Sequence, residues 1–423
     1  MRPRVTTISD EASLCQVWES IAYAGALLCL EGGGQVVVIS RGVRNSHAGP
    51  DYLNGVLLLN GIVTVGDIEL HCHEREWFEH CHDRDRRYDG VILHVVAVRS
   101  GGRRVMLPTF VAGATASAAP AISLDDSGDS ARDTLCTLAW SRLMRRVSEA
   151  RALTGNTGCD PLPWLIEMVC RVIGTSGNSV ALRDFGAVVA ECVRASDIDL
   201  PKELFREILD RSGYPRDLFQ RDLRDLTDVF EHAPSKSVIG CSWRTGGRSS
   251  SIPGRQIVAI ARLAVACRYN GLLYTCASAA INQGPVQCGA EISRASGSPP
   301  LISAGRAMTI TFDAVLPASI AVALTEPDAH LLGGLLRAWR CVPTLPSNRI
   351  IRRFEQRFLR SCRLQGAFWQ AGAMEFERRY GPVNLVRESR SCPWTVSTCQ
   401  GHSKRSHYSA GARLSHSTGN VRH

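Results

Sequence analysis

The chain has 423 residues, of which 44% are hydrophobic and 21% are charged. This composition is typical of a folded globular protein and excludes a collagen, a coiled coil and a wholly disordered chain. The net charge is +9, and only three of the 49 basic residues are lysines, at positions 202, 236 and 404. The first 200 residues therefore offer no lysine to any site that would need one.

The basic charge is concentrated near the end of the sequence. Residues 336–423 carry 16 Arg and Lys against four Glu, whereas residues 1–100 carry nine Arg against 13 acids. A basic C-terminal region can bind the phosphates of DNA or another nucleic acid, and we weigh this against a solvated helix face and tail. Residues 388–423, rich in Ser, His, Gly and Arg, are interpreted as a flexible basic tail.

The 16 cysteines are scattered and form no C-x-x-C pair. The first residues lack the apolar segment of a signal peptide, and no run of 18 apolar residues indicates a membrane helix. We therefore expect a cytoplasmic protein with reduced thiols and no membrane partner. The oligomeric state is left open.

The first 100 residues predict a helix followed by a sheet. A helix is expected at 11–30, and strands at 35–40, 53–59, 62–72 and 91–98, with a short helical segment at 73–82. The pair Asn60-Gly61 indicates a tight hairpin between the second and third strands. The order is helix, strand, strand, strand, helix, strand.

The rest of the chain is predicted to be mainly helical. A domain at 1–111 is followed by a linker at 112–135 and a helical region at 136–387. Helices are expected near 137–153, 162–174, 201–211, 216–231, 253–268, 330–340 and 347–378, and a strand at 309–315.

Titratable residues are concentrated in the predicted sheet. Six of the 12 histidines lie between positions 47 and 94, namely His47, His71, His73, His80, His82 and His94. On the third strand, alternation places Asp67, Glu69, His71 and His73 on one face. Burying four such groups without partners would cost several kcal/mol, on the order of 1–3 each, so they need water, a metal or one another.

The hairpin brings Asp51, at the start of the second strand, close to Glu69 and His71. Two carboxylates that converge on one point suit a hard cation such as Mg²⁺ or Mn²⁺. Such an ion can lower the pKa of a bound water and offset charge on a phosphorane-like transition state.

This pattern resembles the PD-(D/E)XK nuclease superfamily, whose motif is an Asp after Pro and then Glu or Asp, any residue and Lys on the next strand. The matching residues are Pro50-Asp51 and Glu69-Leu70-His71. The resemblance implies an α+β, restriction-endonuclease-like α-β-β-β-α-β core, with a metal held by Asp51 and Glu69 and the Leu70 carbonyl as a further ligand. His71 stands where the family has lysine; it can accept a proton near neutral pH but lacks a permanent charge.

A longer stretch resembles a bacterial family known as domain of unknown function 2851. The matching residues are Gly49-Pro50-Asp51-Tyr52, Gly66-Asp67-Ile68-Glu69-Leu70-His71, Trp77, His80, His82, Asp85, Tyr88 and Leu93-His94-Val95-Val96. Segments at 174–190, 251–264 and 302–317 are weaker matches. The resemblance implies an architecture more than an activity.

Two functions follow as hypotheses. The first is a Mg²⁺-dependent nuclease in which Asp51, Glu69 and His71 are catalytic. The second is a non-catalytic descendant of that fold that binds nucleic acid or a protein partner, which the missing lysine and the acidic first domain favour. In that case Asp51 caps a turn and Glu69 pairs with an arginine such as Arg44 or Arg75. A zinc-dependent hydrolase built on His73, His80 and His82 is a third option.

Overall fold

The computed structural model describes residues 8, 10–31, 34–59, 62–99, 102–112, 128–152, 160–174, 178–195, 200–226, 243–244, 252–359 and 363–380. The predicted tail at 388–423, most of the predicted linker and the pair Asn60-Gly61 lie outside these residues. Within them the chain is a mixed α+β protein, with a seven-stranded sheet first and helices after it, as the sequence predicted.

The N-terminal region contains seven strands and two helices. Its elements are α1 (Glu11–Ile21), β1 (Leu27–Cys29), β2 (Gln35–Ser40), β3 (Val43–Arg44), β4 (Tyr52–Leu59), β5 (Ile62–His73), α2 (Glu76–Glu79), the 3₁₀ turns η1 (His82–Arg84) and η2 (Arg86–Tyr88), β6 (Val91–Val98) and β7 (Thr109–Val111). The strands follow the order β1-β2-β4-β5-β6-β7, with β3 paired to β4. The pairs up to β4–β5 are antiparallel, and β6 and β7 are added in parallel.

The predicted helix at 11–30 is too long, because α1 ends at Ile21. Gly25 follows with a φ of 87°, a left-handed conformation that glycine adopts at low cost, and its N–H donates to the carbonyl of Val38. The chain thereby turns into β1, a strand that the sequence did not predict.

The C-terminal region is helical. Its elements are α3 (Gly128–Ala152), α4 (Leu162–Ile173), α5 (Ser179–Arg194), α6 (Pro201–Asp210), α7 (Arg216–Asp222), α8 (Pro253–Tyr269), α9 (Leu272–Asn282), α10 (Pro285–Ala295), α11 (Ala304–Ile310), the π-helical turn η7 (Thr311–Val315), α12 (Leu316–Ala323), α13 (Ala329–Arg340), α14 (Arg349–Phe354), the π-helical turn η8 (Glu355–Leu359) and α15 (Ala367–Tyr380). Helix α3 begins at Gly128, so it takes in the end of the segment predicted as a linker.

Three predictions for this region are wrong, the first being the helix expected at 216–231, which ends at Asp222 as α7. The segment 309–315 is helical rather than a strand, because its Thr309 and Thr311 hydroxyls donate to carbonyls four residues earlier and Phe312 stacks on Trp339. A run of β-branched and aromatic residues is thus compatible with a helix that is buried on several sides. The helix predicted at 347–378 is broken, and α15 starts only after Gly366, whose φ is 91°.

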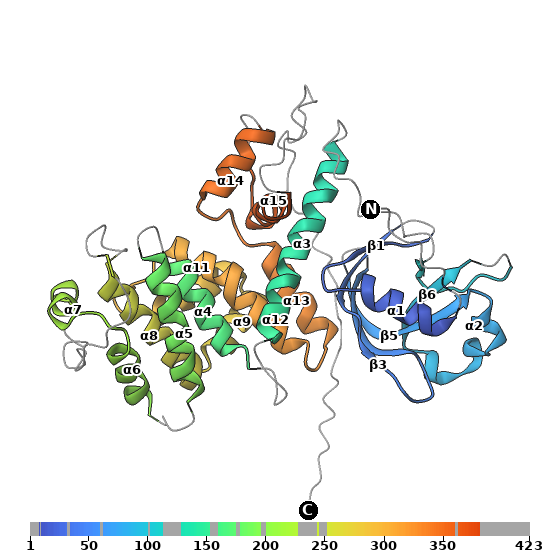
Figure 1. Cartoon of the computed structure of the whole chain (residues 1–423), viewed down its shortest axis with the longest axis horizontal. Coiled ribbons are helices and arrows are strands. Elements are labelled where there is room, and N and C mark those ends of the chain that lie inside the picture. Colours follow the sequence, from blue (N-terminus) through green and yellow to red (C-terminus); the bar gives the residue numbers. More distant parts are fainter. Residues whose placement is uncertain are drawn as a thin grey trace, which may run out of the picture.

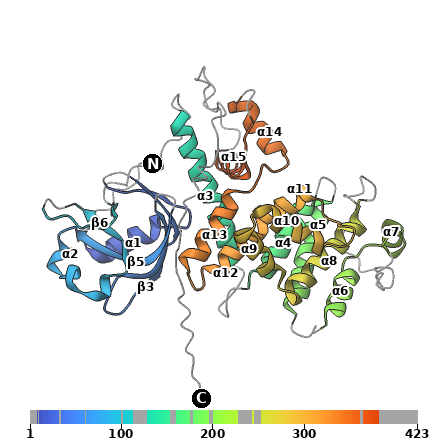
Figure 2. The same ribbon diagram turned by 180° about the vertical axis from the view of Figure 1, so that it is seen from behind.

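The sheet has an apolar layer on each face. Ile68 and Leu70 of β5 face α1 and pack in a core with Leu14 and Trp18. The other face, through Val37, Val56 and neighbouring residues, joins the large core of the helical region. Figure 1 shows α3 and α13 between the sheet and the remaining helices, and Figure 2 shows the same order from behind.

One continuous helical run, Ala304–Ala323, is long and apolar enough to cross a membrane by length and composition, with a mean hydropathy of 1.3. This run was not predicted from the sequence. The bent pair α8 and α9 also passes this test if it counts as one span. Since 72% of the apolar part of Ala304–Ala323 is buried, it has the properties of a core helix in a helical domain.

Candidate metal centre

A bulge in β4 decides which face of the sheet Asp51 joins. Pairing runs without interruption from Leu59–Ile62 to Gly55–Gly66, but Tyr52 then pairs with Ile68, so β4 contains one extra residue. Without that residue, Asp51 would lie opposite Leu70 on the face that packs against α1. The bulge instead places it opposite Glu69.

Asn54 and Asp67 stabilise this bulge. Asn54 has a φ of 56°, in the left-handed region that Asn tolerates better than most residues. Its N–H donates to the Asp67 carboxylate at 3.0 Å. Asp67, which the sequence placed beside Glu69, is therefore used for the backbone geometry that positions Asp51.

Two hydrogen bonds join Asp51 to the segment Glu69-Leu70. The Asp51 N–H donates to Oε2 of Glu69 at 3.1 Å, and the Leu70 N–H donates to Oδ2 of Asp51 at 2.9 Å. Burial, and then the nearby charge of Asp51, raise the pKa of Glu69 to about 9. Burial also raises the pKa of Asp51, although the Leu70 N–H opposes this effect. The two carboxyl groups are thus held side by side in a buried position, where the ionised form of each is disfavoured.

His71, the next residue on this face of β5, is 1% exposed and is oriented by His94 of β6. Its Nδ1 lies 2.8 Å from Nε2 of His94, so one ring donates to the other. Burial, followed by the neighbouring histidines, lowers the pKa of His71 to about 2, and burial lowers that of His94 to about 4. Both rings are therefore neutral near pH 7.

The second nitrogen of His71 points toward Glu69. Oε1 of Glu69 lies 3.5 Å from Nε2 of His71 and 3.2 Å from Nε2 of His82. Because the pKa of Glu69 is raised and those of both histidines are lowered, the proton in this group resides on Glu69 rather than forming an ion pair.

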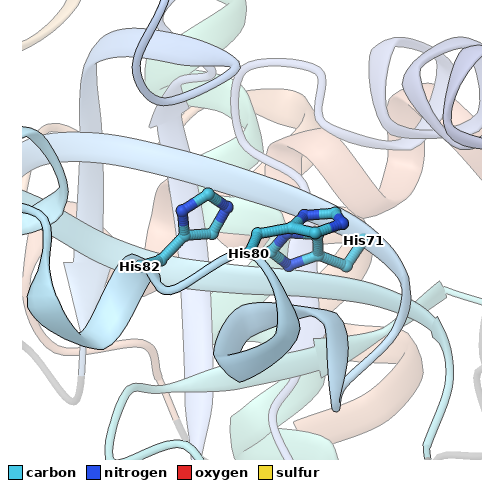
Figure 3. A group of neighbouring side chains, drawn as sticks. All are labelled: His71, His80 and His82. Carbon is cyan, nitrogen blue, oxygen red and sulfur yellow. The ribbon is translucent and has the colours of Figure 1, made fainter.

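Three histidines gather at this point, as Figure 3 shows. His71 comes from β5, His80 follows α2, and His82 begins η1. One ring nitrogen from each lies within 4.8 Å of the others. Nε2 of His71 and Nδ1 of His82 are buried and have no hydrogen-bond partner among the described residues.

Aromatic rings support the histidines from the side. The ring of His82 stacks on Tyr88 with centroids 3.7 Å apart, and Trp77 meets His71 and His82 edge-on. Tyr88 and Trp77 pack with Val91 in a small apolar cluster. The segment from α2 to η2 is thereby anchored to the sheet with its histidines turned toward Glu69.

The predicted residues Asp51, Glu69 and His71 lie together, and two alternatives for them are wrong. The Asp51 carboxylate accepts from Leu70 rather than capping a turn; Asn45 binds the turn instead, through the Pro50 carbonyl. Arg75 pairs with Glu79, and among the described residues the side chains within ion-pair distance of Glu69 are His71 and His82 rather than Arg44 or Arg75.

The histidine cluster differs in one member from the set His73, His80 and His82 that the sequence predicted. His73 is absent from the group and His71 takes its place beside His80 and His82. The sequence named His94 only as one of the six histidines of this region, whereas the structure shows that it orients His71. This role could have been predicted from the position of His94 in the apolar strand that follows the histidines. That strand, β6, pairs in parallel with β5 and places His94 beside Glu69.

The donor set fits a divalent cation. Asp51 and Glu69 each use one carboxylate oxygen for a backbone N–H, which leaves the second oxygen for an ion. A cation would remove the electrostatic cost that raises both carboxylate pKa values. The neutral imidazoles beside Glu69 add nitrogen donors.

The N-terminal region is similar to one known protein family. Residues 11–101 match the model of a family described as "Protein of unknown function (DUF2851)". No curated protein and no solved structure matches the chain. The match includes every residue of the metal centre described above.

Proposed function

We propose that this chain, which in residues 11–101 belongs to the family of unknown function 2851, is a divalent-metal-dependent nuclease of the PD-(D/E)XK type. The observation that carries the proposal is the pairing of Asp51 and Glu69 across the hairpin, with His71 two residues after Glu69. The same three positions carry the metal ligands and the lysine in the superfamily that the sequence resembles.

The order of elements supports this reading. A helix, an antiparallel hairpin carrying both carboxylates, a short helical segment and a parallel strand follow one another as α1, β4, β5, α2 and β6. The chain adds β1, β2, β3 and β7 around that core, and α2 is a single turn of four residues. We propose the nuclease-like fold for this core.

Asp51, Glu69 and the Leu70 carbonyl would hold the ion, either Mg²⁺ or Mn²⁺. The ion would supply an activated water and charge stabilisation for attack on a phosphodiester. His71 is held by His94, so its Nε2 stays directed toward the Glu69 carboxylate and can orient a water. Because its pKa is lowered, His71 is a poor proton acceptor, and unlike the usual lysine it carries no positive charge.

Arginines on the helical region provide a surface for the substrate's phosphates. Arg337 and Arg340 of α13 line a 630 Å³ cavity together with Ile62 and Val63 of β5. Val63 and Glu69 are both odd-numbered positions of one strand, so the cavity and the carboxylates share a face, about 20 Å apart. DNA or RNA lying along this face would contact both.

Cleavage of plasmid and of single-stranded DNA and RNA in Mg²⁺ or Mn²⁺ tests the proposal. Glu69→Gln should lower the rate at least about 100-fold, and His71→Ala at least about 10-fold, whereas the exposed control Glu79→Gln should cleave like the wild type. Cleavage that is unaffected by Glu69→Gln would refute the mechanism.

The alternative is a non-catalytic protein that binds nucleic acid or a protein partner. It is favoured by the replacement of lysine with a buried, neutral histidine. The outcome that supports it is no cleavage by wild type together with salt-dependent binding that Arg337→Glu weakens.

A further inference from the structure

We propose that His71, His80 and His82 form a second metal site, which binds a transition metal ion such as Zn²⁺ beside the carboxylate pair. This site goes beyond the proposed nuclease activity: it shares His71 and Glu69 with that proposal, but its test does not require cleavage. The observation that carries it is the convergence of three imidazoles from three elements, with one nitrogen from each within 4.8 Å of the others.

A buried nitrogen without a partner is the second observation. His71 is 1% exposed, and its Nε2 has no hydrogen-bond partner among the described residues. Leaving such an atom unsatisfied costs about 1–3 kcal/mol. Coordination would satisfy it, because a neutral imidazole nitrogen is a metal ligand.

The other nitrogen of His71 is already engaged as metal-binding histidines require. Ligand histidines commonly donate their second ring N–H to a neighbouring acceptor, which fixes the tautomer and the ring orientation. Nδ1 of His71 lies 2.8 Å from Nε2 of His94. When His71 is the donor of that bond, its Nε2 carries a lone pair directed at the cluster.

The chemistry of the donors selects the ion. Imidazole nitrogens suit Zn²⁺, Co²⁺, Ni²⁺ and Cu²⁺, whereas Mg²⁺ prefers oxygen and keeps its waters. Zn–N bonds of about 2.0–2.1 Å at tetrahedral angles place two nitrogens about 3.4 Å apart. Shifts on the order of 1 Å would close the group, and His80, one of its members, is exposed.

Glu69 lies at the border of the two sites. Its Oε1 is 3.2 Å from Nε2 of His82, while its Oε2 accepts from the Asp51 N–H. Oε1 is also the oxygen that Glu69 leaves for the cation at Asp51, so it would bridge the two ions when both are bound, and it completes a set of three nitrogens and one oxygen around the second.

Co²⁺ titration of the full chain, followed by visible absorption and by metal content after gel filtration, tests the site. Wild type should bind Co²⁺ with the intense visible bands of a four-coordinate nitrogen-ligated ion, and Zn²⁺ should displace it. His80→Ala and His82→Ala should each weaken binding at least about 10-fold. Since His80 is exposed, His80→Ala is expected to fold, and circular dichroism checks this.

Matched controls separate this site from its surroundings. His47→Ala removes an exposed histidine of the same region, and Asp51→Asn keeps an acceptor for the Leu70 N–H but replaces one carboxylate of the pair with a neutral amide. Both should retain the Co²⁺ bands. Absence of the bands in wild type, or bands that persist unchanged in the His80→Ala, His82→Ala double variant, would overturn the proposal.

The two proposals fail separately. If no nucleic acid is cleaved with any metal, the Co²⁺ result still stands on absorption alone. If the Co²⁺ bands are absent while Mg²⁺-dependent cleavage requires Glu69, the nuclease proposal stands and the histidines are an uncoordinated aromatic cluster.

Discussion

The backbone N–H of Asp51 donates a 3.1 Å hydrogen bond to Oε2 of Glu69, the residue that lies across from it on β5. This contact exists because one extra residue in β4 turns Asp51 away from the α1 core. The candidate metal centre therefore depends on a local backbone irregularity as much as on the identity of its carboxylates.

Substitutions at Asn54 should show this dependence. Asn54→Val should lower the free energy of unfolding by about 1–2 kcal/mol, because a β-branched residue is strained at a φ of 56°. Asn54→Gly keeps the conformation and should stay close to the wild type. Urea unfolding measures both. Equal stability of the two variants would show that the bulge is not under this constraint.

Glu69 should make the metal-free protein less stable at alkaline pH. Its pKa is raised from the ordinary 4.5 to about 9, so the folded state holds a proton that the unfolded state has lost in this range. Stability contributed by this group is fully present below pH 4.5 and is lost as pH rises toward 9. From pH 6.5 to 9 we expect a loss of about 3 kcal/mol in EDTA.

The matched comparison is Glu69→Gln, whose free energy of unfolding should change much less over the same range. Thermal or urea unfolding in EDTA at several pH values measures the difference between the two proteins. If wild type and Glu69→Gln show the same alkaline slope, the raised pKa is wrong.

His94 should contribute to acid sensitivity. The pKa values of His71 and His94 are lowered to about 2 and about 4 from the ordinary 6.5. The unfolded chain therefore binds protons first as pH falls, and stability that is present above pH 6.5 is lost toward pH 4. His94→Leu should reduce this loss between pH 6.5 and 4.5 by about 2–3 kcal/mol.

At pH 7 the same variant should be less stable by about 1–3 kcal/mol, because Nδ1 of His71 loses its partner. The exposed control His47→Leu should match the wild type at both pH values. An acid slope in His94→Leu as steep as that of the wild type would contradict the burial of a neutral histidine pair.

Asp313 should stabilise the helical region through a buried ion pair. Nη2 of Arg142 in α3 donates to Oδ1 of Asp313 in η7 at 2.7 Å, and both side chains are mostly buried. Asp313→Ala leaves the guanidinium buried without its partner and should cost about 3 kcal/mol. Asp313→Asn retains an acceptor and should cost less.

A surface pair gives the comparison for this prediction. Glu207→Ala breaks the exposed contact with Arg211 and should cost under about 1 kcal/mol. Chemical unfolding of the three variants ranks them. A cost for Asp313→Ala as small as that for Glu207→Ala would show that Arg142 finds another partner.

Much of the sheet could be predicted from the sequence. The strands at 35–40 and 91–98 have the predicted bounds, because each is a largely buried run rich in β-branched residues. The hairpin between β4 and β5 was predicted from Asn60-Gly61, and the pairing of Leu59 with Ile62 confirms it. Patterns of period two, bounded by turn residues, are strong local signals.

The face that Asp51 occupies could not be deduced in this way. Strict alternation from the hairpin would have directed Asp51 toward α1, and nothing in the pattern marks Leu53-Asn54 as a bulge. That His71 rather than His73 joins the histidine group could not be deduced from the sequence pattern either. Where His80 and His82 lie depends on α2 and η1, two short turns whose path is set by packing of Trp77.

Binding of Mn²⁺ to the full chain, followed by the electron paramagnetic resonance of the free ion, tests the cation site at Asp51 and Glu69 most directly. Asp51→Asn and Glu69→Gln should each weaken binding at least about 10-fold, while the exposed control Asp89→Asn and the histidine variant His80→Ala retain a Mn²⁺ site. Mn²⁺ affinity in Asp51→Asn equal to that of the wild type would contradict the account.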